Sequence, residues 1–132
     1  MTKTALVIDS HVAVRQMLNF ALEVQGCRTA GVAGVSDPFE VLMHGGIDLL
    51  VLGIYGPDDV NSTLIREVRL QPDLEGLPIL LVGEPRLKIH YDLRAIGSCA
   101  WLNKPFRMHE IQGLVESMLN NAPMKSRLGN QE

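Results

Sequence analysis

Short runs of consecutive apolar residues alternate along this chain with longer stretches in which apolar residues recur at helical spacing. The runs lie at residues 5–8, 49–52, 78–82 and 99–102, and residues 28–33 are a weaker strand candidate. The amphipathic stretches lie at residues 12–24, 36–44, 62–71, 87–96 and 108–119. A strand that is apolar at nearly every position is typical of a parallel sheet covered on both faces. Five strands alternating with five helices therefore predict an α/β fold with a doubly wound, five-stranded parallel sheet.

Length and composition limit the organisation of the chain. Its 132 residues, 46% hydrophobic and 20% charged, predict one globular domain over residues 1–120 and a polar C-terminal tail over residues 121–132. The net charge of -3 argues against a nucleic-acid-binding face. No apolar run approaches the ~18 residues that span a membrane, and the first residues do not resemble a signal peptide, so we expect a cytoplasmic protein. Cys27 and Cys99 are too few for a disulfide or zinc framework, and we expect both to be small buried hydrophobic residues.

Five residues of chemical interest come just after predicted strands. They are Asp9, Ser10, Gly53, Gly83 and Lys104. In an open parallel sheet, ligands bind at the carboxyl ends of the strands, close to the point where the strand order reverses. These five positions are therefore the candidate functional site.

A phosphoryl-transfer site at this edge would need an aspartate nucleophile, further oxygen ligands for Mg²⁺, a hydroxyl group and a lysine. Asp9 and Lys104 supply a carboxylate and a cation, but Gly53 carries no carboxylate and Gly83 no hydroxyl. One carboxylate and a few neutral oxygens would hold Mg²⁺ weakly at best. We therefore expect weak or absent Mg²⁺ binding, no other cofactor, no metal site and no enzymatic activity. The absence of a glycine-rich loop after the first strand also argues against a flavin- or nucleotide-binding enzyme.

Several segments together resemble a known family. They are residues 6–11 (LVIDSH), 48–57 (DLLVLGIYGP), 64–69, 78–82 and 97–106, the last ending in Lys104-Pro105-Phe106. Over residues 4–120 the chain resembles the CheY-like response-regulator receiver domains of bacterial two-component signalling. This resemblance implies the flavodoxin-like (βα)5 fold.

The family's phosphorylation machinery carries over only in part. Asp9 matches the first member of the family's acidic pair, whereas Ser10 takes the place of the second. Gly53 takes the place of the phosphoacceptor aspartate, and Gly83 takes the place of the Thr or Ser that senses the phosphoryl group. Lys104 matches the family's lysine. The resemblance therefore implies an atypical receiver, a pseudo-receiver that lacks the phosphoacceptor.

Two further positions match the family's switch. Trp101 matches the aromatic residue that moves between exposed and buried rotamers, and Pro105 matches a proline that typically follows a cis peptide bond. Trp101 is either an exposed hot spot for a partner or a fixed core side chain. His90 and Arg94 lie in a mildly basic fourth helix, which is either a docking face or ordinary solvated charge. Gly83 and Pro85 suggest that the loop between them is held in one conformation.

Other site residues have a plain structural interpretation beside a functional one. Lys104 either binds an anion in the vacated pocket or, as we favour, pairs with Asp9, since an unpaired buried charge is costly. Ser10 is expected to cap the first helix rather than to accept a phosphoryl group. Asp58 and Asp59 are expected to be solvated loop carboxylates. They lie five and six residues after Gly53, where they would not have the in-line geometry with Lys104 that phosphoryl transfer needs.

The sequence therefore favours a receiver-like signalling domain that acts in trans through protein–protein interaction, independently of phosphorylation. The expected partner is a signalling protein, a kinase or an output protein, and a homodimer through the fourth helix, fifth strand and fifth helix is a further possibility. Nucleic acid and membrane partners are not expected. Two alternatives stay open: a sensor that binds a small ligand or anion in the vacated pocket, and a phosphotransfer receiver with a substitute acceptor.

Overall fold

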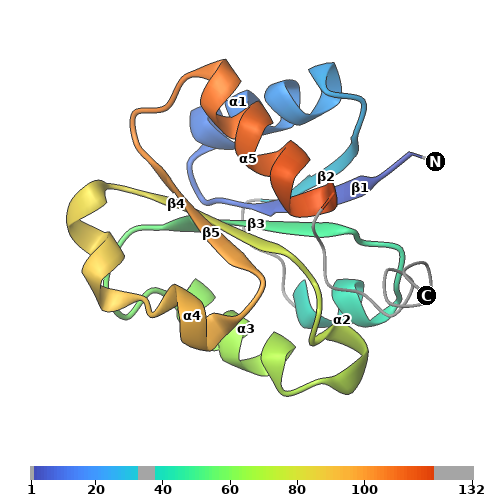
Figure 1. Ribbon diagram of the computed structural model, residues 1–132, viewed down its shortest axis with the longest axis vertical. Helices are drawn as coiled ribbons and strands as arrows, with labels where there is room; N and C mark the ends of the chain where they lie inside the picture. The colour runs from blue at the N-terminus through green and yellow to red at the C-terminus, as the bar shows by residue number, and fades with distance from the viewer. Residues whose placement is uncertain (1, 33–37, 121–132) are drawn as a thin grey trace.

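The computed structural model describes residues 2–32 and 38–120 and has a five-stranded parallel sheet at its centre (Figure 1). The strands are β1 (Thr4–Ile8), β2 (Arg28–Val32), β3 (Leu49–Ile54), β4 (Ile79–Gly83) and β5 (Cys99–Asn103). The α-helices are α1 (Val12–Val24), α2 (Pro38–Met43), α3 (Val60–Arg69), α4 (Leu93–Ile96) and α5 (Met108–Asn120), and two 3-10 helices cover η1 (Pro72–Leu74) and η2 (Pro85–His90). The predicted α/β fold is confirmed. The predicted tail over residues 121–132, and the predicted helix start at residues 36 and 37, lie outside the described residues.

In the strand order β2-β1-β3-β4-β5, the topological switch point lies between β1 and β3. Leu6 lies opposite Ala30 on one side and Leu50 on the other, so β1 is an inner strand. The order changes direction at β1, since the chain first builds outward to β2 and then crosses back to β3. This switch point puts the carboxyl ends of β1 and β3 side by side, which is where the candidate site lies.

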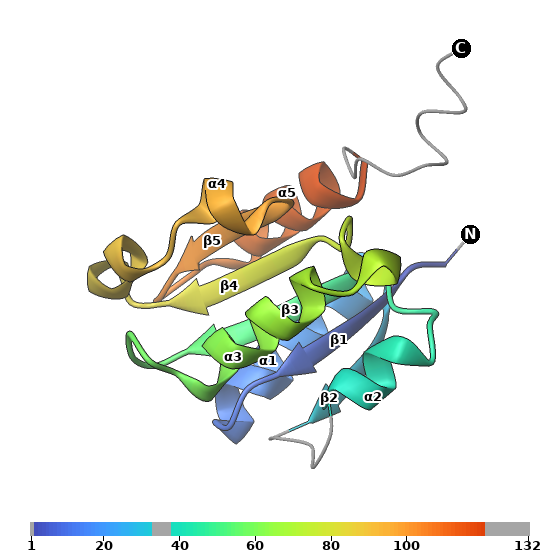
Figure 2. The ribbon, with the colours of Figure 1, turned by 90° about the horizontal axis from the view of Figure 1, so that it is seen from below.

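Helices cover both faces of the sheet (Figure 2). Strand residues of alternating parity divide between two hydrophobic clusters, as the pleat requires. Ala5, Val7 and Val51 pack in the cluster that includes α1 and α5. Leu6, Leu52 and Leu81 pack in the other, which includes α2, α3 and α4. We call these the α1/α5 side and the α3/α4 side.

The predicted fourth helix over residues 87–96 is wrong in part, because the segment divides into η2 and the four-residue α4. Tyr91 between them has extended backbone dihedral angles (φ -126°, ψ 117°). Its side chain is buried, and its hydroxyl donates to the carbonyl of Gly56 at 2.8 Å. A continuous helix would not leave Tyr91 in this conformation, so the tertiary contact interrupts the helix.

Arg69 at the end of α3 ties together the opposite edge of the sheet. Its guanidinium donates to four backbone carbonyls, those of Ile96, Leu74, Leu77 and Ser98. The distances lie between 2.6 and 3.0 Å. Burial lowers the pKa of Arg69 from its ordinary value, and the carbonyl dipoles take the place of a carboxylate partner.

Candidate functional site

Four residues from three strand ends meet on the α1/α5 side of the sheet. Asp9 follows β1, Gly53 lies within β3, Tyr55 follows β3, and Lys104 follows β5. Strand alternation explains the meeting, since Val7, Val51 and Leu102 each lie on this side two residues earlier. Three of the five predicted site residues are therefore brought together, and Tyr55 joins them.

Asp9 is the buried centre of the site, with only 1% of its surface exposed. Its Oδ1 accepts hydrogen bonds from the Tyr55 hydroxyl at 2.6 Å and from the His11 backbone N–H at 2.8 Å. Among the described residues, its Oδ2 has no hydrogen-bond partner. The carboxylate is thus held on one oxygen and unpaired on the other.

The carboxylate of Asp9 lies directly against Gly53. A Cβ atom added at Gly53 would overlap Asp9 Oδ2, would lie 2.7 Å from Asp9 Cγ, and would lie 3.1 Å from the Tyr55 ring. Real Cβ atoms do not approach other heavy atoms this closely. The space beside Gly53 is therefore occupied by a neighbouring carboxylate rather than left empty.

Tyr55 closes the site from outside. Its ring stacks on that of His11 at 4.4 Å between centroids, and Lys104 Nζ lies 3.8 Å from its centroid. A cation over an aromatic face is attracted by the ring's quadrupole. Burial, and then the hydrogen bond with Asp9, raise the pKa of Tyr55 above its ordinary value. Sequence reasoning missed this residue, although its position two residues after Gly53 placed it on the same side of the strand.

The predicted ion pair between Lys104 and Asp9 is wrong. In the described part of the chain, no carboxylate oxygen lies within 4.0 Å of Lys104 Nζ, whose ammonium rests on the Tyr55 ring instead. Desolvation lowers the pKa of Lys104, although the nearby charge of Asp9 acts in the opposite direction. Tyr55 separates the two charges and contacts both.

Two predictions about loop side chains are also wrong. Ser10 is exposed and does not cap α1, whose first position is preceded by His11 without a side-chain capping bond. Asp59 is not simply solvated, because it caps α3 by accepting from the Asn61 N–H at 2.9 Å. Its other oxygen accepts from the Tyr55 N–H at 2.8 Å, so Asp59 also fixes the loop that carries Tyr55. Asp58 is exposed, as predicted.

Gly83 faces the opposite side of the sheet and does not join the cluster around Asp9. A Cβ atom added there would lie 2.9 Å from the carbonyl oxygen of Ile54 and 3.0 Å from the Trp101 ring. Trp101 is 8% exposed, and its Nε1 donates to Asn103 Oδ1 at 2.8 Å. Of the two alternatives for Trp101, the fixed core side chain is the one observed, so Trp101 is not part of the exposed interaction surface. The Tyr91 ring lies beside it at 5.8 Å.

The remaining switch residues lie at the surface. The Lys104–Pro105 peptide bond is cis, as the resemblance implies, and Pro105 is exposed. His90 and Arg94 are exposed on η2 and α4. The two cysteines, which we expected to be buried, are only partly buried. Burial raises the pKa of Cys99 to about 12.

The chain is similar in sequence to curated proteins that are transcriptional regulators. The chain is 28% identical over 120 residues to the phosphate regulon regulator PhoB of Rhizobium meliloti, covering 88% of this chain and 52% of that protein. It is 28% identical over 119 residues to the transcriptional regulator NtrC of Azospirillum brasilense, covering 89% of this chain and 24% of that protein. The chain thus spans about half the length, or less, of these curated relatives.

Solved structures share the fold over nearly the whole chain. The chemotaxis response regulator CheY4 of Vibrio cholerae superposes with a TM-score of 0.76 at 21% identity, covering 90% of this chain and all of that one. The receiver domain of a histidine kinase from Syntrophus aciditrophicus gives 0.78 at 20% identity, covering 94% and 95%. The chain therefore has the fold of the CheY-like response-regulator receiver domains. No family model matches it.

The residues of the candidate site do not fit a Mg²⁺ ion well. Mg²⁺ needs near-octahedral oxygen ligands and usually more than one source of negative charge. Here Asp9 is the single carboxylate at the position, and its Oδ1 is already engaged by Tyr55 and His11. Within residues 2–32 and 38–120 no cluster of three or more His, Cys, Asp or Glu side chains could hold a metal ion.

In the same residues, no helix has the length and apolar character needed to cross a bilayer.

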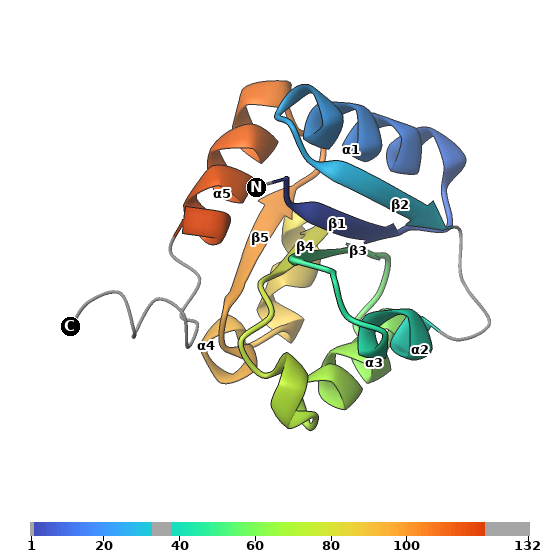
Figure 3. The ribbon, with the colours of Figure 1, turned by 90° about the vertical axis from the view of Figure 1, so that its right-hand side faces the viewer.

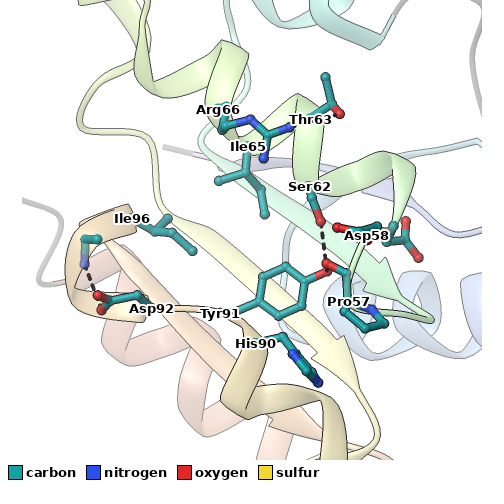
Figure 4. A pocket seen from close by; sticks show the side chains of 12 residues that line it. Pro57, Asp58, Ser62, Thr63, Ile65, Arg66, His90, Tyr91, Asp92 and Ile96 are labelled. Carbon is teal, nitrogen blue, oxygen red and sulfur yellow. Dashed lines mark hydrogen bonds between the residues drawn. The ribbon is translucent and has the colours of Figure 1, made fainter.

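A pocket of about 380 Å³ lies on the α3/α4 side of the sheet, between α3 and the η2–α4 segment (Figure 4). Figure 4 shows the Tyr91 side chain across its centre, with its hydroxyl 2.8 Å from Ser62 Oγ. Asp58 and His90 lie at its edge. The pocket separates α3 from η2 and does not reach the cluster around Asp9.

Proposed function

We propose that this receiver domain works in two-component signalling through protein–protein contacts and does so without phosphorylation at position 53. The observation that carries the proposal is the packing of Asp9 against Gly53, which leaves no room for even a β-carbon. An acceptor group and its phosphoryl would have to displace a buried, hydrogen-bonded carboxylate. We assign no enzymatic reaction to the chain, and we expect it to work in the cytoplasm.

The proposed active form is a single, fixed one. In the family, the switch aromatic moves when a hydroxyl next to it engages the phosphoryl group, as the resemblance implies. Here Gly83 has no hydroxyl, and Trp101 packs against its Cα position. Trp101 also holds a hydrogen bond to Asn103. Both features support an inward Trp101 that no phosphoryl signal moves.

The proposed partner surface is the α4–β5–α5 face. Exposed side chains there include Ile89, which is 86% exposed, and the basic residues His90 and Arg94. An exposed aliphatic group beside positive charge suits a partner protein with an apolar contact ringed by carboxylates. A homodimer through this face is the other form of the same proposal.

Two alternatives receive less support from the geometry. A ligand sensor would need space near Asp9 and Lys104, but Tyr55 packs between them and contacts both. A substitute acceptor would need a free carboxylate in the loop, but Asp59 is engaged by two backbone N–H groups. Asp58 is exposed and belongs to the α3/α4 pocket instead.

Titration with Mg²⁺ and beryllofluoride, a mimic of aspartyl phosphate, tests the proposal. The readouts are amide NMR shifts and the fluorescence of Trp101, which is the only tryptophan in the chain. We expect no saturable shift at Asp9, Gly53 or Lys104 and no change in fluorescence, whereas a phosphorylatable receiver run in parallel should respond. Saturable shifts around Asp9, or stable labelling of Asp58 by acetyl phosphate, would contradict phosphorylation independence.

A further inference from the structure

Helix α1 has a second apolar face that the fold does not use. Leu18, Ala21 and Leu22 are buried against the sheet. Ala13, Met17, Phe20 and Val24 are exposed instead, at successive spacings of four, three and four residues. At 3.6 residues per turn, this spacing aligns the four side chains in one stripe along the helix. We call these four residues the α1 stripe.

The α1 stripe is unusual for its continuity. Met17, Phe20 and Val24 are 54%, 58% and 58% exposed. The most exposed large hydrophobic residues elsewhere in the described chain, Ile89, Val60 and Leu70, lie apart from α1, on η2 and at the two ends of α3, and do not form a row of this kind. Single exposed apolar residues are ordinary, but a continuous row on one helix is typical of an interaction surface.

The stripe is free of charge. The two charged residues of α1 are Arg15 and Glu23, and each has a partner in the same domain. Arg15 donates to the backbone carbonyl of Asp9 at 2.7 Å, and Glu23 accepts from the Thr29 hydroxyl at 2.7 Å. A neutral apolar row does not repel a second copy of itself. Figure 3 shows α1 on the outside of the domain, with α5 beside it and its outer side uncovered.

We propose that the α1 stripe binds the α1 stripe of a second copy of this chain, with the two helices antiparallel. A twofold axis between Met17 and Phe20 would place Met17 of each copy beside Phe20 of the other, and Ala13 beside Val24. Sulfur–aromatic contacts are favourable, and a small residue opposite a larger one packs closely. The spacing of alternately three and four residues is the one that two packed helices share.

The size of the stripe sets the strength of the association. Its half-exposed side chains offer on the order of 300 Å² of apolar surface per copy, by comparison with the ~200 Å² that one aromatic side chain can bury. Two copies then bury less than the ~1,000 Å² of a stable interface. The dimer is therefore weak, with a dissociation constant on the order of 100 µM.

Analytical ultracentrifugation of the full chain tests this proposal over protein concentrations from about 10 µM to about 1 mM, which bracket that dissociation constant. We expect the mean mass to rise toward that of a dimer. Phe20→Glu and Met17→Lys should each keep the chain monomeric, with at least a tenfold weaker association. Leu70→Glu and Ile89→Glu, which change even more exposed apolar residues off the stripe, should associate like the unchanged chain. Circular dichroism checks that each variant is folded.

The outcomes separate this surface from the face in the proposed function. A chain that stays monomeric up to about 1 mM would overturn the α1 dimer, even if the stripe were then found to bind a different protein. Association that Ile89→Glu abolishes and Phe20→Glu leaves intact would overturn it as well, and would assign the dimer to the α4–β5–α5 face. Neither result bears on the beryllofluoride titration, so the two proposals fail independently.

Discussion

At the scale of single residues, the site is organised by Gly53 and the side chains around it. Gly53 has no side chain, and the buried carboxylate of Asp9 occupies the space beside it. Tyr55 then donates to Asp9 and lies under the Lys104 ammonium. The space beside Gly53 is thus filled by protein atoms. Because of this packing, any side chain at position 53 would have to displace Asp9.

Gly53→Ala should destabilise the fold by about 1–3 kcal/mol, the usual cost of forcing extra volume into a packed site. The added Cβ must displace Asp9, which is held by Tyr55 and His11. Chemical denaturation measures the effect. Gly56→Ala is the matched control, because a Cβ there meets nothing within 4 Å, and it should be nearly neutral.

A double-mutant cycle identifies Asp9 as the cause. In an Asp9→Ala background the clash is relieved, so Gly53→Ala should cost at least ~1 kcal/mol less than it does alone. Equal costs in both backgrounds would mean that Asp9 does not occupy the space beside Gly53.

The two tyrosines, the only ones in the chain, should resist ionisation at alkaline pH. Burial raises the pKa of both Tyr55 and Tyr91 above the ordinary value. Because the folded-state pKa is the higher one, their contribution to stability is complete below pH ~10 and is lost as the pH rises above it. The ultraviolet absorbance of tyrosinate should therefore appear only together with unfolding. Tyrosinate absorbance near pH 10 in a chain still folded by circular dichroism would contradict this.

At the scale of elements, two segments are set by contacts from elsewhere in the fold. The η2–α4 segment is interrupted so that Tyr91 can reach Gly56 and Ser62. At the other edge, Arg69 bonds carbonyls from η1, α4 and the residues just before β4 and β5. In both cases one side chain from a helix or a loop fixes the position of its neighbours.

Arg69→Ala should lower the free energy of unfolding by about 2–4 kcal/mol, because it leaves several carbonyls without their charged donor. Arg69→Lys should recover only part of the loss, since an ammonium cannot reach four carbonyls in a planar fork. Arg66→Ala, one turn earlier on the same helix and exposed, should change stability by no more than ~0.5 kcal/mol. Equal effects at the two positions, measured by denaturation, would refute the role given to Arg69.

At the scale of the whole molecule, the proposed functions lie on different surfaces. The filled site is at the carboxyl ends of β1, β3 and β5, and the α1 stripe runs along the outside of α1. The residues Ile89, His90 and Arg94 lie on η2 and α4, on the other side of the sheet (Figure 2). Self-association through α1 would therefore leave the exposed residues of η2 and α4 accessible.

The fold could be predicted from the sequence, because apolar runs and the helical spacing of apolar residues are both local patterns. Runs such as residues 49–52 predicted buried strands, and the spacing of Leu18, Ala21 and Leu22 predicted the buried face of α1. The sequence also identified Asp9, Gly53 and Lys104 as one site, since the topology of a parallel sheet brings strand ends together. It could not assign the partner of Lys104, because pairing depends on the directions of side chains.

Whether the space beside Gly53 is empty could not be predicted, because it depends on contacts between distant segments of the chain. Asp9 and Tyr55 are 46 residues apart in sequence, and their hydrogen bond exists only once β1 and β3 pair. The same holds for Trp101, whose buried position depends on the missing side chain at Gly83 on the neighbouring strand. Local patterns specify which residues lie on which face, whereas the filling of a space depends on volumes contributed by several distant segments at once.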